Sequence, residues 1–291
     1  MFCGKNTYEL VKWIWRKYAE VKIKKIEVNH ENMIYLEGNH ESKRVIVMLH
    51  GITADKYVWS IFARKFVKEG YRVIIPDLPP FGESSYNENI NYSIEYQAKN
   101  LKVFLKILGV DKFHIMGNSM GGGIATKFTI LYPQTINSLV LFDNMGIYSV
   151  KKTKFLKNLE EGKRNLMLIK NKKELDIMLK LVYHKIPFIP FPIKEELLKE
   201  SIINYNKNKH VFDNLLTENW DLEKELYKIN VPTFIMWGKY DNVFDISTLG
   251  VINKGIKNSQ SFIVDNCGHM PMNEKALFSS KMILNFLQKL N

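Results

Sequence analysis

The sequence predicts an α/β fold built on a mostly parallel sheet that is flanked by helices. From Val45 onwards, short apolar runs of strand length alternate with longer segments of helical periodicity, and glycine or proline closes most of them. The chain has 291 residues and is 46% apolar, which is enough to bury one large core. Chains of this length and pattern commonly form one domain with an insertion, so two full domains are not expected.

The first segment, residues 1–20, predicts an amphipathic helix. Its apolar residues recur at helical spacing, and basic residues and tryptophans surround them. The apolar set is Leu10, Val11, Ile14 and Tyr18, with Lys12, Trp13, Trp15, Arg16 and Lys17 around it. A basic helix with tryptophans can lie in a lipid headgroup region, and docking against the rest of the domain is the alternative.

Residues 21–145 and 216–291 are expected to form the core of the domain. Alternating residues from Val21 to Leu36 predict an amino-terminal hairpin. The strands expected after it are 45–49, 71–75, 113–116, 139–142, 232–238 and 261–264, with helices at about 58–68, 93–108 and 119–133. Because the carboxyl ends of parallel strands meet at one edge of a sheet, a ligand crevice is expected at that edge.

The alternation breaks between residues 146 and 215, where we expect a helical lid inserted after the sixth strand of the core. Fifteen Lys and Arg residues against eight acidic residues give this segment a charge of +7, more than half of the +12 of the whole chain. Prolines in 186–193 predict an extended, stiff segment, and Phe188, Ile189 and Phe191 are expected to line an apolar binding pocket. A connector packed on the lid helices is the alternative.

A G-x-S-x-G sequence occupies residues 117–121, directly after the strand 113–116 and before an expected helix. This context predicts a nucleophile elbow, a sharp turn that lifts a serine side chain, here Ser119, clear of the sheet edge. Glycines flank the serine because neighbouring backbone passes too close for a Cβ atom. For the five-residue match alone, an ordinary serine in a glycine-rich turn is the alternative.

Three further features occur where a serine nucleophile needs them. Asp241 follows the strand 232–238 and His269 follows the strand 261–264, so both are expected at the same sheet edge as the serine. A histidine there can take the serine proton, and an aspartate can orient the imidazole. Upstream, His50-Gly51-Ile52 ends the strand 45–49. The backbone N–H groups of Ile52 and Met120 are the expected donors to a substrate oxyanion.

The chain order Ser119, Asp241, His269 resembles that of the α/β-hydrolase superfamily, and the likeness extends from about Met33 to the C-terminus. Within the superfamily, the motifs resemble the monoacylglycerol-lipase-like branch and its bacterial lipase and esterase relatives. These motifs are residues 48–51, 81–85, 117–122, 237–241 and 266–269. Pro80 departs from the pattern, because relatives usually carry glycine there, and it leaves the shape of its loop open.

The resemblance implies a serine hydrolase that cleaves carboxylic esters of lipophilic acyl groups through an acyl-serine intermediate. The expected substrate is a monoacylglycerol or a short-to-medium-chain glyceride, and neither a metal nor a cofactor is expected. Two alternatives stay open. One is a C–C bond hydrolase that acts on meta-cleavage dienoates with the same triad, and the other is a non-catalytic ligand-binding hydrolase fold, against which the complete triad argues.

Several other residues near the motifs compete for these roles. Asp143 follows the strand 139–142, where some lipases place their acid, but Asp241 has the better local match. Asp265 is expected to be structural, and Cys267 is expected to pack beside the catalytic histidine. His50 is expected to hold the oxyanion loop.

The charge of +12 is compatible with a nucleic-acid partner, but the chain has no run of five like charges and no aromatic RNA-binding signature. A basic surface also raises the rate of encounter with anionic lipid. No apolar stretch approaches the ~18 residues of a membrane span, and the first residues lack an apolar signal region. We therefore expect no nucleic-acid partner, a cytoplasmic location, and reversible contact with an anionic membrane surface.

Overall fold

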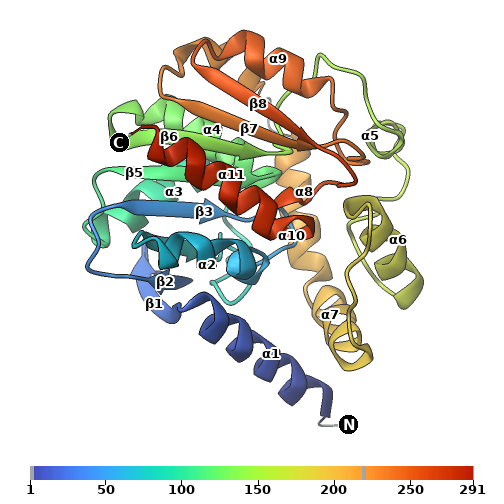
Figure 1. Ribbon diagram of the computed structural model, residues 1–291. Helices are drawn as coiled ribbons and strands as arrows, with labels where there is room; N and C mark the ends of the chain where they lie inside the picture. Colours follow the sequence, from blue (N-terminus) through green and yellow to red (C-terminus); the bar gives the residue numbers. More distant parts are fainter. Residues whose placement is uncertain (1–2, 218–220, 291) are drawn as a thin grey trace.

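The structure is a computed structural model that describes residues 3–217 and 221–290 (Figure 1). Its centre is an eight-stranded sheet with helices on both faces. The strands are β1 (Lys22–Val28), β2 (Glu31–Gly38), β3 (Val45–Leu49), β4 (Arg72–Pro76), β5 (Phe113–Asn118), β6 (Ile136–Phe142), β7 (Thr233–Gly238) and β8 (Ser259–Val264).

The strands lie in the order β1-β2-β4-β3-β5-β6-β7-β8. β1 and β2 form the antiparallel hairpin that the sequence predicts, with Asn29 and His30 at positive φ in its turn. β2 pairs with β4 in antiparallel fashion, and the remaining pairs of the sheet are parallel. Every residue of β3, β4 and β5 is buried, as expected for central strands of a sheet with both faces covered. The predicted mostly parallel α/β sheet is confirmed.

Two groups of helices cover the faces of the sheet. α3 and α4 pack together on one face with α9 nearby, and α2 and α11 pack together on the other. These helices are α2 (Ser60–Lys68), α3 (Ile94–Ile107), α4 (Met120–Leu131), α9 (Thr248–Gly255) and α11 (Ala276–Gln288). Shorter elements are α10 (Pro271–Glu274), η1 (Lys56–Trp59), η2 (Pro133–Thr135) and η3 (Leu222–Lys228). α3 begins after Ser93 because the Ser93 hydroxyl accepts a hydrogen bond from the Tyr96 N–H.

In the described part of the chain, four α-helices lie between β6 and β7. They are α5 (Lys154–Glu160), α6 (Lys172–Val182), α7 (Phe191–Ile203) and α8 (Tyr205–Thr217). The expectation of an extended segment over the whole of 186–193 is wrong, because α7 begins at Phe191. Pro192 lies in the first turn of α7, where a missing N–H costs no hydrogen bond and the fixed φ suits a helix. The prolines therefore begin a helix here.

α1 (Cys3–Ala19) lies along the outside of the domain and packs against α2 and α7 (Figure 1). Tyr8 and Lys12 are buried on its inner side, whereas Leu10, Trp13 and Ile14 remain 54%, 47% and 47% exposed. The helix thus docks on the domain with one side and presents apolar residues to solvent with the other. Among the described residues, no helix has the length and apolar character needed to cross a bilayer.

Lys56 is a buried lysine that joins the loops after β3 and β4. Its Nζ donates to Asp77 Oδ2 at 2.6 Å and to Glu83 Oε1 at 2.8 Å. Its backbone N–H donates to Asp77 Oδ1 at 2.8 Å. The side chains of Lys56 and Asp77 are only 1% and 0% exposed, so each charge depends on the other for compensation. The pair fixes the segment that leaves the predicted oxyanion loop.

Replacing Lys56 with methionine is expected to lower the free energy of unfolding by about 3–5 kcal/mol, because the Asp77 carboxylate then stays buried without its counter-ion. Urea denaturation measures the change. Lys65→Met is the matched control, since Lys65 donates to Glu69 at 2.8 Å from a side chain that is 42% exposed. Exposed pairs of that kind contribute about 0–1 kcal/mol. Equal losses in the two variants would contradict this role of Lys56.

Candidate active site

Ser119 lies at the sharp turn between β5 and α4. Its backbone has φ 56° and ψ −120°, a conformation that few non-glycine residues adopt. A Cβ atom at Gly117 would lie 2.2 Å from the Gly121 carbonyl oxygen, and one at Gly121 would lie 2.3 Å from the Leu49 carbonyl oxygen. The turn therefore requires glycine on both sides of the serine, because it brings the backbones of β3, β5 and α4 together.

Asp241 and His269 meet at the carboxyl end of the sheet, in the loops after β7 and β8. His269 Nδ1 lies 2.9 Å from Asp241 Oδ2, so Nδ1–H donates to the carboxylate. Asp241 Oδ1 accepts from the backbone N–H groups of Val243 and Phe244 at 2.7 and 3.2 Å. The His269 and Asp241 side chains are 4% and 1% exposed. A charge-assisted hydrogen bond is strong in such dry surroundings.

The backbone of His269 is bonded both to the serine strand and to the inserted helices. Asn118 Nδ2, on the residue before Ser119, donates to the His269 carbonyl oxygen at 3.0 Å. The His269 N–H donates to the carbonyl oxygen of Val182, the last residue of α6, at 2.9 Å. These two bonds hold the histidine loop beside the serine turn and beneath the insertion.

The second ring nitrogen of His269, Nε2, is buried and has no hydrogen-bond partner among the described residues. It is the nitrogen that the bond to Asp241 leaves able to accept a proton. Ser119 is 5% exposed and lies on the adjoining turn. Hydrogen bonds between catalytic groups are often long without substrate and tighten when it binds. The unsatisfied acceptor therefore lies on the loop that Asn118 bonds to the serine turn.

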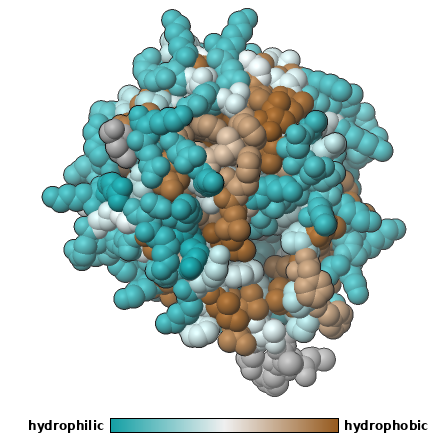
Figure 2. All heavy atoms as spheres, in the orientation of Figure 1, coloured by the Kyte–Doolittle hydropathy of each residue, from teal (hydrophilic) through white to brown (hydrophobic). Residues whose placement is uncertain are grey.

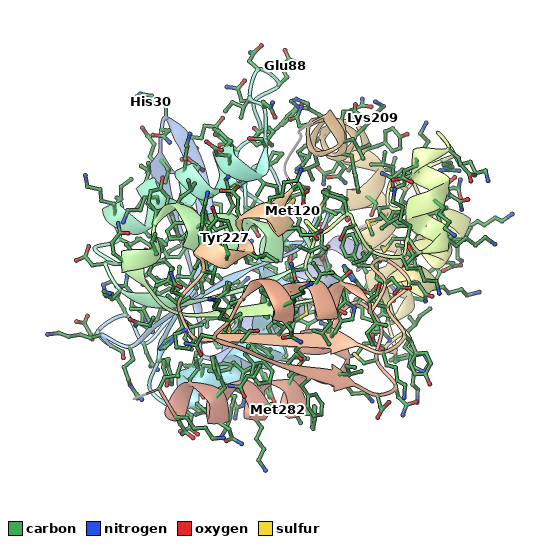
Figure 3. The ribbon with its side chains drawn as sticks, turned by 90° about the horizontal axis from the view of Figure 1, so that it is seen from above. His30, Glu88, Met120, Lys209, Tyr227 and Met282 are labelled. Carbon is green, nitrogen blue, oxygen red and sulfur yellow. The ribbon has the colours of Figure 1, made fainter. Side chains whose placement is uncertain are left out.

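Both predicted oxyanion donors lie on segments that touch Ser119. Met120 is the first residue of α4 and is buried, and Figure 3 shows it near the centre of the molecule. The first N–H groups of a helix have no partner within the helix, so they can donate to a negative charge. On the other side, a Cβ at Gly51 would lie 3.2 Å from the Ser119 Cβ, and Ile52 follows Gly51 directly.

His50 fixes the predicted oxyanion loop. Its Nε2 accepts from the Leu78 N–H at 2.9 Å, and its Nδ1 lies 2.8 Å from the Gly51 carbonyl oxygen, to which it donates. Burial lowers the pKa of His50 to about 4, so the ring stays neutral near pH 7 and both bonds are kept. The neighbouring loop contains a cis peptide bond between Pro79 and Pro80.

Asp143 lies beside the Asp241–His269 pair. It follows β6, the neighbour of β7, and one ligand atom from each of the three side chains lies within 4.8 Å of the others. Asp143 Oδ1 accepts from the Gly238 N–H at 2.9 Å, whereas the imidazole bonds to Asp241. This spacing is also compatible with a metal ion, although two of the three groups are already bonded to each other.

Residues 44–276 match the family model described as the alpha/beta hydrolase fold. The chain belongs to this family. It is 30% identical to Lipase 1 from Psychrobacter immobilis over 275 residues, which cover 92% of this chain and 85% of that lipase. It is 29% identical to a monoacylglycerol lipase from Homo sapiens over 288 residues, which cover 94% of this chain and 85% of that lipase. Among solved structures, a bacterial membrane phospholipase A, described as a virulence factor, is 32% identical, with a TM-score of 0.96 and coverage of 100% and 93%.

In this α/β hydrolase, two of the three residues expected to line an apolar pocket are largely exposed, and the pocket itself stays a prediction. Phe188 and Phe191 are 91% and 68% exposed, and Ile189 packs on a small cluster made by α6. The physical reason is the helical start at Phe191, which splits the apolar run between an irregular stretch and a helix. Within residues 186–190, positions 186–188 are exposed, and Ile189 packs on the cluster formed at α6.

Proposed function

We propose that this α/β hydrolase cleaves carboxylic esters of lipophilic acyl groups with Ser119 as its nucleophile. Hydrolysis of carboxylic esters follows from the family and from the named lipases to which the chain is similar. The observation that carries the serine mechanism is the buried His269–Asp241 pair beside the turn that holds Ser119. The proposed substrate is a monoacylglycerol or a short-to-medium-chain glyceride.

In the first half of the reaction, Ser119 Oγ attacks the ester carbonyl carbon. His269 Nε2 accepts the hydroxyl proton and then gives it to the leaving alcohol. Asp241 keeps the imidazole in the required tautomer and stabilises the imidazolium. The N–H groups of Met120 and Ile52 donate to the oxyanion, and losing one such donor typically costs ~3 kcal/mol. In the second half, water attacks the acyl-serine by the same route.

We also propose that residues 146–215 form a lid over a core made of 21–145 and 216–291, with 1–20 as a separate docking helix. The bond from the His269 N–H to Val182 brings this insertion against the histidine loop. His184 lies two residues beyond the end of α6, and its ring stacks on that of Tyr240 with ring centroids 4.4 Å apart. Tyr240 precedes Asp241. The insertion therefore contacts the loops that carry both the acid and the base.

A panel of p-nitrophenyl esters and 1-acylglycerols of increasing chain length tests the proposed substrate. The expected result is hydrolysis of the acylglycerols that depends on Ser119 and has an optimum in chain length. If the folded protein hydrolysed no ester of any length, the proposal would be wrong. Consumption of a meta-cleavage dienoate without ester turnover would instead assign C–C bond hydrolysis to the same residues.

We further propose that the enzyme works at an anionic membrane surface and contacts it through a docking face made by α1, the start of α7 and the residues just before α7. The apolar residues of this docking face are Leu10, Trp13, Ile14, Phe188 and Phe191, all of them exposed. α1 packs against α7, and Figure 2 shows hydrophobic residues gathered at the end of the molecule where these helices lie. The exposed Lys17 in the last turn of α1, and the +7 of the insertion, complement anionic lipid.

Co-sedimentation with vesicles tests the docking face. Wild type is expected to bind anionic vesicles at low salt and to bind less as salt rises, since the Debye length is ~8 Å at physiological ionic strength. A triple variant, Leu10→Ser, Trp13→Ser and Ile14→Ser, is expected to bind at least about tenfold less, because it lacks the apolar side chains that would be buried in the membrane interface. Leu277→Ser is the control, since this exposed leucine lies on α11. Absence of binding to anionic vesicles even at low salt would contradict the proposal.

A further inference from the structure

Asp143 is a buried carboxyl group to which the ester mechanism gives no role. It directly follows β6, and Asp241 lies three residues after the end of β7. Because β6 and β7 are parallel neighbours, the two carboxyl groups meet at one edge of the sheet. Asp143 is 0% exposed, and the Asp241 side chain is 1% exposed. The backbone of Asp143 has φ 44°, which is uncommon for a residue other than glycine.

The hydrogen bonds of the two carboxyl groups are unequal. Asp241 accepts three, from the Val243 and Phe244 N–H groups and from His269 Nδ1. Asp143 accepts one, from the Gly238 N–H to Oδ1. Its Oδ2 is buried and has no hydrogen-bond donor among the described residues. A buried acceptor without a donor costs about 1–3 kcal/mol. If Oδ2 carries a proton, it becomes a donor and the cost disappears.

Charge repulsion between Asp143 and Asp241 independently indicates that one of the two carboxyl groups carries a proton. Two buried carboxyl groups this close cannot both ionise without a large cost, so one of them keeps a proton. The titratable groups that face Asp143 are Asp241, His269, Glu274 and Cys267. Burial, followed by the charge of Asp241, raises the pKa of Asp143 well above its ordinary value, and the Gly238 N–H opposes this only in part. Burial also raises the pKa of the Cys267 thiol, which stays neutral.

We infer that Asp143 is a positioning residue that keeps its proton during catalysis and donates it from Oδ2 to Asp241. Asp241 is then the one ionised carboxylate that faces His269, held by four donors instead of three. The hydrogen remains on Asp143 throughout, so no proton transfer is added to the reaction. This inference rests on the proposed roles of Asp241 and His269.

Two substitutions at Asp143 separate this role from simple packing. In Asp143→Asn, the amide oxygen can still accept from Gly238 and the amide nitrogen can donate to Asp241, so kcat is expected to stay close to that of wild type. Asp143→Ala removes the donor. It is expected to lower kcat by about 10- to 100-fold with little change in KM, since displacement of a catalytic group by about 1 Å can cost that much. Rescue by the amide identifies a hydrogen-bond donor.

The stability of Asp143→Asn against pH is a readout that does not depend on activity. If the pKa of Asp143 is higher in the folded than in the unfolded state, the unfolded chain binds fewer protons than the folded chain at any pH between the two pKa values. The free energy of unfolding of wild type therefore falls as pH rises through this window, which begins near the ordinary aspartate value of about 3.9. Asparagine does not titrate. The variant is thus expected to gain stability relative to wild type as pH rises from about 4 towards neutral.

Three results would overturn the inference. One is a loss of kcat in Asp143→Asn as large as in Asp143→Ala, because that would require an ionised carboxylate at this position. Another is a fall in the relative stability of Asp143→Asn as pH rises. The third is loss of wild-type activity on dialysis against a chelator, which would make the cluster a metal site. The proposed function fails separately, since it requires that wild-type ester hydrolysis depend on Ser119.

Discussion

Replacing Ser119 with alanine is expected to lower kcat/KM for an acylglycerol by about 10⁶-fold. The variant has no oxygen to attack the ester, and removing one member of a proton-transfer unit removes nearly the whole effect of that unit. The fold should be unchanged, because alanine keeps the Cβ atom and the backbone of the turn. Initial rates measure the loss, and circular dichroism and thermal unfolding check the fold.

Ser247→Ala is the matched control for this substitution, since Ser247 is exposed in the loop before α9 and its side chain caps no helix. Its rates are expected to equal those of wild type. His269→Ala is expected to match Ser119→Ala, because the two residues act as one unit. If either variant kept a tenth of wild-type activity while folded, the assignment of nucleophile and base would be wrong.

Replacing Asp241 with asparagine is expected to lower kcat by up to ~10⁴-fold with little change in KM, by analogy with the serine-protease triad. The carboxylate accepts a hydrogen from His269 Nδ1 at 2.9 Å. An amide nitrogen in that place donates instead, so Nδ1 loses its proton and Nε2 gains one. The imidazole can then no longer take the serine proton. Rates and KM measured over a range of pH separate this loss from a loss of binding.

Asp265→Asn is the control for the acid, because Asp265 is 70% exposed and forms only a surface ion pair with Lys239 at 2.7 Å. It is expected to have wild-type rates. An undiminished kcat in Asp241→Asn would contradict the proposed acid. So would a larger loss in Asp143→Asn than in Asp241→Asn, since the structure bonds the imidazole to Asp241 alone of these two.

The sequence predicts the parts of the site that depend on local geometry. The glycines around Ser119 are required by close backbone contacts at a single turn, so a short motif is enough to indicate that turn. Asp241 follows the buried strand β7, and His269 follows β8, the more exposed strand at the edge of the sheet. Parallel strands bring their carboxyl ends together. The antiparallel hairpin at the start of the sheet is likewise marked by alternating residues and a polar turn.

Features that depend on contacts between distant segments could not be predicted in the same way. Asp143 was recognised only as a rival acid, because its contact with Asp241 depends on β6 lying next to β7. The exposure of Phe188 and Phe191 could not be predicted either, because an apolar run with prolines fits both an extended segment and the start of a helix. Which side of α1 is buried and which is exposed depends on its packing against α7, which is distant in the sequence.

Labelling with a fluorophosphonate tests most directly whether this protein is a serine hydrolase, because a serine activated by its own base attacks the phosphorus, releases fluoride and is left as a phosphonate ester. Mass spectrometry of the intact protein is expected to show one adduct per chain, and digestion should place it on the peptide that contains Ser119. Ser119→Ala should remain unlabelled, and Asp143→Asn should be labelled like wild type. A folded wild-type protein without an adduct, or an equal adduct on Ser119→Ala, would contradict the account.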